Sequence, residues 1–503
     1  MSKSIKIDPF SRIEGHLAIR IEVAENHIKE AFCSGEMFRG FENILNNRHP
    51  LDAQQITQRI CGVCPIDHGI ASVLAQDAAY RVTPPENGWL VRNLIQGANY
   101  LMSHITHFYH LSALDFVDIT AIRKYTGNDP QLSYLKDWVE VQLASKSIYP
   151  AAPFLPRYEG DYLKDTSFNV VAIKHYLEAL EIRALCHKMA AVFCGKIPHA
   201  PALIPGGVTE RVTIDKIISY RSMLQKVQTF VENAYLPDVL AVAKAFPDYF
   251  KIGRGCGNFL AYGAFPESTG QKTQLFPPGV VISGRLTSLD ISQITEDVMY
   301  SLFASPSGLS PSRGQTVPDP HKAMAYSWLK APRYKRQVME VGPLARMMVL
   351  YLKGETPVKE QIDVVLASLD KRPDDLISVM GRHAARALET RIIAARCFAW
   401  LDQLMPGKPA FADFEIPDTG QGVGLTEAAR GALGHWLEIK NGRIANYQCV
   451  VPTTWNCSPR DDQGNPGAVE TALVGTPVAD DKNPIEAARV VRSFDPCIAC
   501  AVH

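Results

Sequence analysis

The chain lacks net charge, and it lacks any long hydrophobic run. Among its 503 residues, 52 lysines and arginines balance 52 aspartates and glutamates. This balance gives no electrostatic reason to expect a nucleic-acid partner or an anionic membrane surface. No apolar stretch reaches the length of about 18 residues that a bilayer requires, so we expect no direct membrane span. The N-terminal residues 1–10 also lack the apolar core and small-residue cleavage site of a signal peptide.

Motifs for binding nucleotides and for serine hydrolysis are missing as well. The sequence contains neither Gly-x-x-x-x-Gly-Lys-(Ser/Thr) nor Gly-x-Ser-x-Gly. The segment Gly253-Arg-Gly-Cys-Gly257 lacks the third glycine and the preceding buried strand of a dinucleotide-binding loop. These absences argue against nucleotide chemistry and against a nucleophilic serine.

Cysteine is scarce, yet four cysteines form an informative pattern. The 11 cysteines are an odd number and too few for a disulfide scaffold. Two Cys-x-x-Cys motifs, Cys61-Gly-Val-Cys64 and Cys497-Ile-Ala-Cys500, lie near opposite ends, with their first members 497 − 61 = 436 positions apart. Together they can supply four thiolates to a soft metal. Such a site requires the fold to bring the two ends of the chain together.

The hydrophobic pattern predicts a mainly α (α+β) fold. We expect a core bundle of long helices, small peripheral β-sheets, and a metal site buried between the two motifs, all in a single domain over residues 1–503. Asn441-Gly442 predicts a hairpin turn, and Asn483-Pro484 predicts the start of a helix that ends near residue 493. The expected helices cover 52–80 (interrupted at 61–65), 90–116, 168–195, 211–245 and 376–405, and the expected strands lie in 16–33 and, irregularly, 253–286.

The residues alone leave the metal open. Four cysteines can also form a structural zinc site that ties the termini together, although such sites usually have their two cysteine pairs closer in sequence. His68, four residues after Cys64, is better placed to support a thiolate than to act as a fifth ligand. His104, His107 and His110 recur every three residues on one predicted helix, and we interpret them as hydrogen-bonded helix histidines, with a metal triad as the alternative.

Several motifs, taken in order along the chain, resemble the large, catalytic subunit of nickel–iron hydrogenase. The resemblance covers essentially the whole chain. The matching segments are Arg12-Ile-Glu-Gly-His16, Arg59-Ile-Cys-Gly-Val-Cys64, Glu340-Val-Gly-Pro-Leu-Ala-Arg346, Ala429-Arg-Gly-Ala-Leu433, Val450-Val-Pro-Thr-Thr-Trp455 and Asp495-Pro-Cys-Ile-Ala-Cys-Ala-Val-His503.

This resemblance implies a bimetallic centre and an enzymatic reaction. Cys61 and Cys497 would be terminal nickel ligands, and Cys64 and Cys500 would bridge nickel to iron. The iron would carry carbon monoxide and cyanide. The implied activity is that of a hydrogenase, the reversible heterolytic cleavage of dihydrogen to protons and electrons, with oxidation or evolution of hydrogen as its two directions.

The resemblance also implies roles for residues around that centre. Cys497 would accept the proton, and Glu14 would relay it as general acid and base. Arg430 would lie over the open metal position, oriented by Asp495. The Thr453 hydroxyl would bind a cyanide.

A magnesium ion is implied near the C-terminus. Its ligands would be Glu42, the backbone carbonyl of Cys449 and the imidazole of His503, with waters completing an octahedron. Glu340 would touch one of those waters. A chain that ends at His503 is similar to family members from which a C-terminal extension has been removed.

Two positions depart from the common family pattern. Ala429 stands where many members have proline beside the diatomic ligands, and Ser103 stands where many have aspartate. Ser103 and the segment that begins at Cys33 resemble the nickel–iron–selenium branch, which has selenocysteine at the position of Cys497. We therefore expect a cysteine-containing relative of that branch.

The resemblance further implies partners and a compartment. The chain has too few spare cysteines for an electron wire of its own, so we expect a heterodimer with an iron–sulfur small subunit, near Arg39, Gln58 and Arg59. A redox partner such as a cytochrome would be reached through that subunit. The expected location is the periplasm, by export with the small subunit, or a membrane through partners, with the cytoplasm as the alternative. A hydrogen sensor and a quinone-binding relative remain alternatives, although the latter lacks the four cysteines.

Overall fold

The computed structural model describes residues 3–145, 160–267, 273–354 and 356–503. These residues form fifteen α-helices and only small sheets, as the sequence predicts. The helices are α1 (Phe41–Leu45), α2 (Asp52–Thr57), α3 (Pro65–Tyr80), α4 (Glu86–Thr106), α5 (Pro130–Ser145), α6 (Thr166–Cys194), α7 (Ile214–Phe230), α8 (Leu236–Ala245), α9 (Pro343–Lys353), α10 (Thr356–Leu369), α11 (Val379–Gln403), α12 (Pro452–Asn456), α13 (Ala468–Leu473), α14 (Ile485–Ser493) and α15 (Ile498–Ala501).

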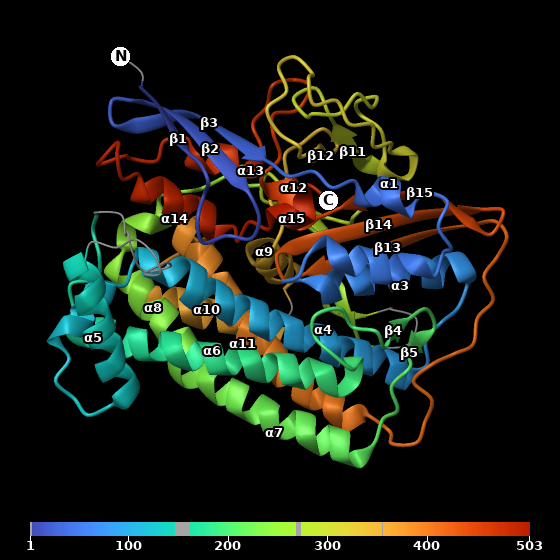
Figure 1. Ribbon diagram of the computed structural model, residues 1–503, viewed down its shortest axis with the longest axis horizontal. Coiled ribbons are helices and arrows are strands. Elements are labelled where there is room, and N and C mark those ends of the chain that lie inside the picture. Colours follow the sequence, from blue (N-terminus) through green and yellow to red (C-terminus); the bar gives the residue numbers. More distant parts are fainter. Residues whose placement is uncertain (1–2, 146–159, 268–272, 355) are drawn as a thin grey trace.

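The long helices pack side by side in one half of the molecule (Figure 1). α4 contacts α6 and α11, and α7 contacts the same two helices. Every residue of α4 from Asn87 to Ile105 is buried, because this helix is apolar or hydrogen-bonded on all sides and has neighbours all round it. α4 is therefore the central helix of the bundle. None of the described helices is both long enough and apolar enough to cross a membrane.

The sheets are antiparallel and contain two or three strands each. Their orders are β1-β2-β3, β10-β9-β6, β13-β14-β15, β11-β12, β4-β5 and β7-β8. The strands are β1 (Lys3–Ile7), β2 (Leu17–Ala24), β3 (His27–Gly35), β4 (Leu203–Ile204), β5 (Gly207–Val208), β6 (Phe259–Ala261), β7 (Ala264–Pro266), β8 (Gln274–Phe276), β9 (Gly279–Ile282), β10 (Arg285–Thr287), β11 (Ile294–Asp297), β12 (Ala331–Tyr334), β13 (Gly420–Ala428), β14 (Gly431–Lys440) and β15 (Arg443–Val450).

Both predicted hairpins are present. Asn441 and Gly442 join β14 to β15 with φ values of 53° and 63°, the positive pair that a tight hairpin turn of this kind needs. The N-terminal hairpin is β2–β3. The pairing of β1 with β2 extends it to a sheet, which the sequence analysis does not predict.

Helix ends differ from the predictions in three places. The predicted helix 90–116 is α4 followed by a wider π-helical turn, His107–Ser112, and 211–245 is α7 and α8 joined by a similar turn, Val231–Tyr235. A π turn leaves the apolar pattern almost unchanged, so the sequence does not reveal it. The prediction that Asn483 caps a helix beginning at Pro484 is wrong. Pro484 has ψ 63°, so α14 begins at Ile485, and the Asn483 amide donates to Asp480 instead.

The packing of β13 on α3 places the first cysteine motif, just before α3, close to the turn between β13 and β14. β13 lies against α3 (Figure 1), and a Cβ at Gly422 or Gly424 would lie only 1.9 or 2.0 Å from a backbone oxygen of α3. These glycines allow strand and helix to approach closely. The N-terminus of α3, after Cys64, therefore lies next to the turn that joins β13 to β14.

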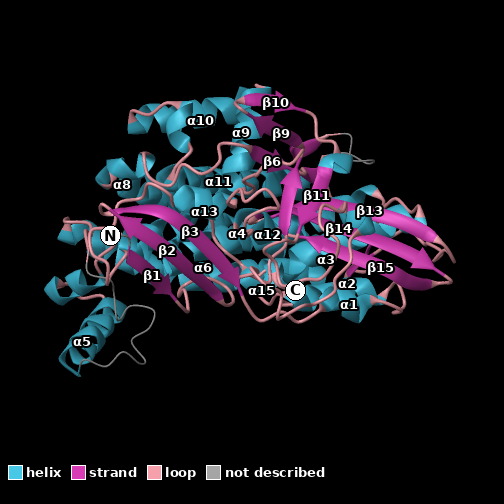
Figure 2. Ribbon diagram, turned by 90° about the horizontal axis from the view of Figure 1, so that it is seen from above, coloured by secondary structure: helices cyan, strands magenta, loops and turns pink. Residues whose placement is uncertain are grey.

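The C-terminal segment is enclosed by the N-terminal part of the chain. Glu14 and Cys497 form a parallel bridge, in which the Ile498 N–H donates to the Glu14 carbonyl at 2.8 Å. The His503 carbonyl accepts hydrogen bonds from the backbone of residues 40 and 41. In Figure 2 the C-terminus lies beside α15, within the outline of the molecule. The C-terminal segment thus lies against the N-terminal part of the chain, as a shared thiolate site requires.

Candidate metal centre

The four paired cysteines converge at one buried point. Cys64 Sγ lies 3.0 Å from Cys500 Sγ, and Cys497 Sγ lies 3.0 Å from Cys500 Sγ and 3.4 Å from Cys61 Sγ. All four sulfur atoms lie within 4.8 Å of one another, and each residue is at most 4% exposed. These separations are too long for disulfides. Four convergent sulfur donors are a ligand set for a soft metal.

The electrostatics of the cluster favour a bound cation. Burial raises the pKa of Cys497 and Cys500 well above the range of an ordinary thiol. Hydrogen bonds from the neighbouring thiols, above all that of Cys497, hold the pKa of Cys61 well below its usual value. The protein alone therefore stabilises a thiolate at Cys61 but opposes charge on the other pair. A metal ion supplies the positive charge that lets all of them ionise.

Glu14 contacts the cluster directly. Its Oε2 lies 3.1 Å from Cys497 Sγ and accepts a hydrogen bond from the Ala499 N–H at 3.1 Å. Burial raises the pKa of the Glu14 carboxyl, and the nearby Cys61 adds to this. A carboxyl with a raised pKa, within hydrogen-bond reach of a thiol, can exchange a proton with it.

Arg430 is held beside the thiolates by Asp495. It lies on the two-residue turn between β13 and β14. Its Nε donates to the Asp495 backbone oxygen at 3.1 Å, and an ion pair of 3.1 Å joins its guanidinium to Asp495 Oδ1. Arg430, Cys64, Cys497 and Cys500 line one small cavity. A cation on that wall can stabilise negative charge within the cavity.

Thr453, Ala429 and His68 also lie around this cavity. The Thr453 hydroxyl oxygen accepts a hydrogen bond from the Cys497 N–H at 2.9 Å, so its own proton is free to donate. Ala429 is buried in the turn beside Arg430, but its neighbour Ala428 lines the cavity instead. The hydrogen bond of His68 runs to His435 at 3.2 Å rather than to a thiolate, and burial lowers the pKa of His68 to about 3. His68 is thus a neutral imidazole on the cavity wall.

Asp67 is a wall residue that the sequence analysis misses. Its side chain is fully buried and lines the same cavity. Burial raises the pKa of its carboxyl to about 7. The only signal in the sequence is an acidic residue three positions after Cys64, in the first turn of α3. Such a residue is common at a helix N-terminus for reasons unrelated to a metal.

A second buried cluster joins Glu42, Cys449 and His503. Glu42 Oε1 lies 3.2 Å from His503 Nε2 and accepts a hydrogen bond from the Cys449 N–H at 2.8 Å. Burial alone would raise the pKa of the Glu42 carboxyl, but the Lys330 ammonium and His503 outweigh it and hold the pKa well below its usual range. A charged carboxylate next to an imidazole suits a hard cation such as magnesium.

The glutamate next to this second cluster is Glu296 rather than Glu340. Glu296 lines the cavity that Glu42, Lys330 and His503 also line. Glu340 instead forms a two-pronged ion pair with Arg382, at 2.7 and 2.8 Å. The expected contact of Glu340 with a metal-bound water is therefore wrong. The error arises because a motif match gives residue identity and not the direction of a side chain.

The three helix histidines have separate partners and form no metal triad. His104 Nε2 lies 3.0 Å from Glu389 Oε2, and His107 Nε2 lies 2.6 Å from the Arg492 carbonyl oxygen. His110 Nε2 lies 3.2 Å from the Tyr176 carbonyl oxygen. The prediction of hydrogen-bonded helix histidines is confirmed.

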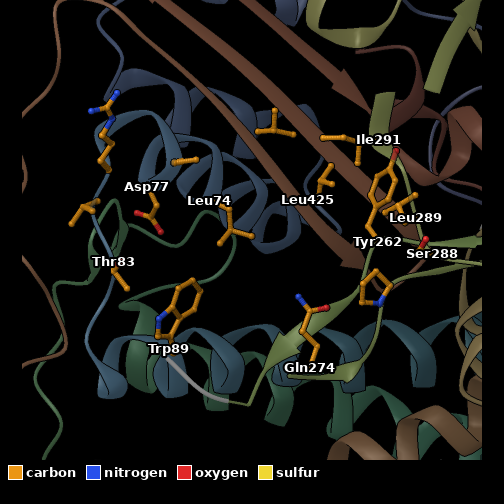
Figure 3. Close-up of a pocket in the computed structure, with 15 residues that line it drawn as sticks. Leu74, Asp77, Thr83, Trp89, Tyr262, Gln274, Ser288, Leu289, Ile291 and Leu425 are labelled. Atoms are coloured by element: carbon orange, nitrogen blue, oxygen red, sulfur yellow. The ribbon is translucent and has the colours of Figure 1, made fainter. Parts of the chain in front are cut away.

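A larger cavity of about 760 Å³ lies elsewhere, between α3, β13 and the strands near Tyr262 (Figure 3). It is lined mostly by apolar side chains, including Leu74, Leu289 and Leu425. Its carboxylate, Asp77, is engaged by Arg92 at 2.6 Å. Among its described residues no set of metal-ligating side chains converges. The small thiolate cavity is therefore the candidate for chemistry, although it is far smaller.

Comparison with protein families gives a match over nearly the whole chain. The family model described as nickel-dependent hydrogenase matches residues 39–503, and one described as HoxL-like matches residues 4–33. The periplasmic NiFeSe hydrogenase large subunit of Desulfomicrobium baculatum is 45% identical over 514 residues, covering 99% of this chain and 94% of that protein. The hydrogenase-2 large chain of Escherichia coli K12 is 35% identical over 555 residues, covering 100% and 97%.

Solved structures give the same result for the fold. The NiFeSe hydrogenase of Dm. baculatum superposes with a TM-score of 0.89 at 44% identity, covering all of both chains. The reduced Ni-Fe-Se hydrogenase of D. vulgaris Hildenborough gives 0.90 at 43% identity, again over all of both chains. The likeness therefore includes both ends of the chain, where the two cysteine motifs lie.

Proposed function

The chain belongs to the nickel-dependent hydrogenase family and is a hydrogenase large subunit, and we propose that it cleaves dihydrogen reversibly at a nickel–iron centre held by its four clustered cysteines. The observation that carries this proposal is the convergence of the four sulfur atoms, with Glu14 in contact with Cys497. A structural zinc site needs the sulfur atoms but has no use for a carboxyl group that shares a proton with one of them.

Each of the four clustered cysteines has a proposed place in the metal centre. Cys61 and Cys497 would hold nickel, and Cys64 and Cys500 would hold it together with an iron that carries carbon monoxide and cyanide. When bound, this centre supplies the Lewis-acid and redox chemistry for heterolytic cleavage of hydrogen. The soft sulfur donors and their dependence on a cation for ionisation support this assignment.

Glu14 is the proposed proton carrier. Its Oε2 takes a proton from the Cys497 sulfur at 3.1 Å and returns it in the reverse direction. Burial raises the pKa of Glu14 above that of an ordinary glutamate, which makes its carboxylate a better proton acceptor. Because Glu14 is partly exposed, it can pass the proton from the buried thiolates to solvent.

The polar groups proposed to stabilise negative charge in the cavity are the Arg430 guanidinium, held by Asp495, and the Thr453 hydroxyl. Asp495 fixes the Arg430 guanidinium at two points, so its charge is oriented toward the cavity before any reaction occurs. The free hydroxyl proton of Thr453 is available to a cyanide, and Ala429 holds Arg430 in its turn. His68, a neutral imidazole, completes the wall.

Magnesium is the proposed occupant of the second cluster. Glu42 and His503 provide side-chain ligands, and Cys449 provides its backbone carbonyl, because a thiol is a poor ligand for a hard cation. The His503 imidazole also bonds the Cys500 carbonyl at 2.7 Å. A cation held there would fix the C-terminus and, through it, a cysteine of the main site.

Partners and location are proposed from the relatives. Large subunits of this kind imply an iron–sulfur small subunit, which passes electrons onward to a redox protein such as a cytochrome. Arg39, whose guanidinium bonds the Ile60 and Ala499 carbonyls next to both cysteine motifs, is a candidate neighbour of that subunit, with Gln58 and Arg59. The Dm. baculatum relative is described as periplasmic, and we propose the same compartment, reached by export with the small subunit. Cys497 makes this chain a cysteine-containing relative of the NiFeSe branch.

The test of the proposed function uses Cys497→Ala. The purified wild-type complex should contain nickel and iron and reduce an artificial dye with hydrogen. Cys497→Ala should lose nickel and all measurable turnover, because it removes one metal ligand and the proton acceptor together. A matched control is Cys457→Ala, since Cys457 is also buried but lies outside the cluster. An active, nickel-loaded Cys497→Ala variant would refute the proposal.

A further inference from the structure

The thiolate cavity contains a carboxylate with an unmet hydrogen-bonding oxygen. Asp67, the third residue of α3, is fully buried. Its Oδ2 accepts hydrogen bonds from Asn99 Nδ2 at 3.1 Å and from the Ala429 N–H at 3.4 Å. Its Oδ1 has no partner among the described residues. A buried polar atom without a partner is unfavourable, so this oxygen needs an explanation.

Arg430 has the complementary unmet donor. Its Nε and Nη2 face Asp495, but its buried Nη1 has no partner among the described residues. Asp67 and Arg430 line the same cavity, and Ala429, whose N–H reaches Asp67, is the residue directly before Arg430. The charge of Arg430 also opposes the rise that burial causes in the pKa of Asp67. The residues of the free acceptor and the free donor therefore line the same small cavity.

The other arginine whose charge acts on Asp67 is not available to it. Arg346 also lowers the pKa of Asp67. All its nitrogens are engaged, by Glu389, Glu427 and the carbonyl oxygens of Ala428 and Ala429. Arg430 is thus the one of these two cations with a nitrogen left to donate.

We propose that Asp67 is a second positioning carboxylate for Arg430, resting on the function proposed above. Its Oδ1 accepts a hydrogen bond from Arg430 Nη1, directly or through one bound water. Asp495 then holds one edge of the guanidinium and Asp67 the other, so the plane of the cation is fixed across the cavity. Asp67 acts through the arginine and does not touch a metal.

The first test uses the assembled enzyme with Asp67→Asn and Asp67→Ala. Nickel and iron content should remain at the wild-type level in both. Turnover should fall roughly tenfold in Asp67→Ala, the effect of about one hydrogen bond to a charged group. The KM for hydrogen should not change. The fall should be smaller in Asp67→Asn, which keeps an acceptor oxygen. The infrared bands of the iron ligands should shift in Asp67→Ala, because the charge beside them is no longer fixed.

Ser103→Ala is the matched control. Ser103 is buried on α4, one turn from Asn99, and its hydroxyl also lacks a partner, but it does not line the cavity. Its removal should leave turnover and bands unchanged. If Asp67→Ala matched the wild type in both turnover and band positions, the positioning role would be refuted, while a loaded and active wild type would leave the proposed function standing.

A second measurement keeps the inference testable if the variants lose their metals. A high-resolution crystal structure of the wild-type complex should place Asp67 Oδ1 within about 3.2 Å of Arg430 Nη1, or both within that distance of one water. An Oδ1 bonded to any other group would overturn the inference. A wild-type protein without nickel and iron would instead overturn the proposed function, and this contact would still be readable in it.

Discussion

At the scale of single residues, Glu14 is the carboxyl group in direct contact with the cysteine cluster. One of its oxygens serves both the Cys497 sulfur and the Ala499 N–H. Burial raises the pKa of the carboxyl, with a further rise from Cys61, so it remains protonated to a higher pH than an exposed glutamate does. These properties belong to a group that holds a proton temporarily rather than to a metal ligand.

Glu14→Gln should separate proton movement from metal binding. Glutamine keeps the size of the side chain and an oxygen for the Ala499 N–H, so nickel and iron content should not change. It cannot gain or lose a proton, and proton–deuterium exchange under deuterium gas should fall by about a hundredfold or more, the lower end of general acid–base effects. Glu36→Gln, at an exposed glutamate directly after β3, is the control. Normal exchange in a fully loaded Glu14→Gln enzyme would remove the relay role.

Single residues with a role were predictable only where they lie in a recognisable motif. The cysteines, Glu14 and Arg430 stand in such motifs. Asp67 and Glu296 do not, because their place on a cavity wall depends on which way a buried carboxylate points. That direction is set by α3 packing on β13 and by the pairing of β11 with β12, and neither contact can be read from local sequence.

At the scale of elements, the short loop before β2 holds the C-terminal turn in place. Gly15 has φ +83°, and a Cβ there would lie 2.6 Å from the Ala499 nitrogen and 3.0 Å from Ile498 Cβ. The bridge between Glu14 and Cys497 therefore depends on a missing side chain. Without that close approach, Glu14 cannot reach the sulfur.

Gly15→Ala should displace the turn that carries Cys497. We expect a loss of stability of about 1 kcal/mol or more, together with reduced nickel content. Thermal unfolding and metal analysis measure the two effects. Gly257→Ala is a matched control, because Gly257 has a similar φ of +70° but nothing within 4 Å of the added Cβ. Equal nickel content in both variants would mean that this close contact does not hold the site together.

The elements themselves were largely predictable, and the exceptions have physical causes. Long apolar repeats and the Asn441-Gly442 turn are strong local signals. The π-helical turns after α4 and α7 were not predictable, because one extra residue in a turn barely alters an apolar pattern. The pairing of β1 with β2 depends on contacts distant in sequence from any turn signal.

At the scale of the whole molecule, a buried ionic network links the helix bundle to the site. Arg346 donates to Glu389 Oε2 at 2.8 Å and to Glu427 Oε2 at 2.6 Å. It also bonds the carbonyl of Ala429, next to Arg430. Burial alone would raise the pKa of Glu389, but the charge of Arg346 outweighs it and holds the pKa at about 2.

Glu389→Gln should cost about 3 kcal/mol of stability at neutral pH, because it removes one partner of a buried ion pair. The pKa of Glu389 is lower in the folded chain than its usual 4.5, so its stabilisation is present above that value and is lost as pH falls toward about 2. The difference in Tm between wild type and variant should therefore be largest near pH 7 and should decrease below about pH 4. Glu232→Gln is the control, since it breaks an exposed pair with Arg391 that is worth little. A gap that did not change with pH would contradict the assigned charge of Glu389.

The convergence of the two cysteine motifs into four buried sulfur atoms is the central structural fact. One measurement tests most directly what these sulfur atoms bind. An infrared spectrum of the purified complex, in the region where metal-bound carbon monoxide and cyanide absorb, reports on the iron alone. The nickel–iron account predicts carbonyl and cyanide bands in the wild type. A folded wild-type protein that contains zinc and shows no such bands would contradict it. The four cysteines would then form a structural zinc site that ties the N-terminal part of the chain to the C-terminal segment.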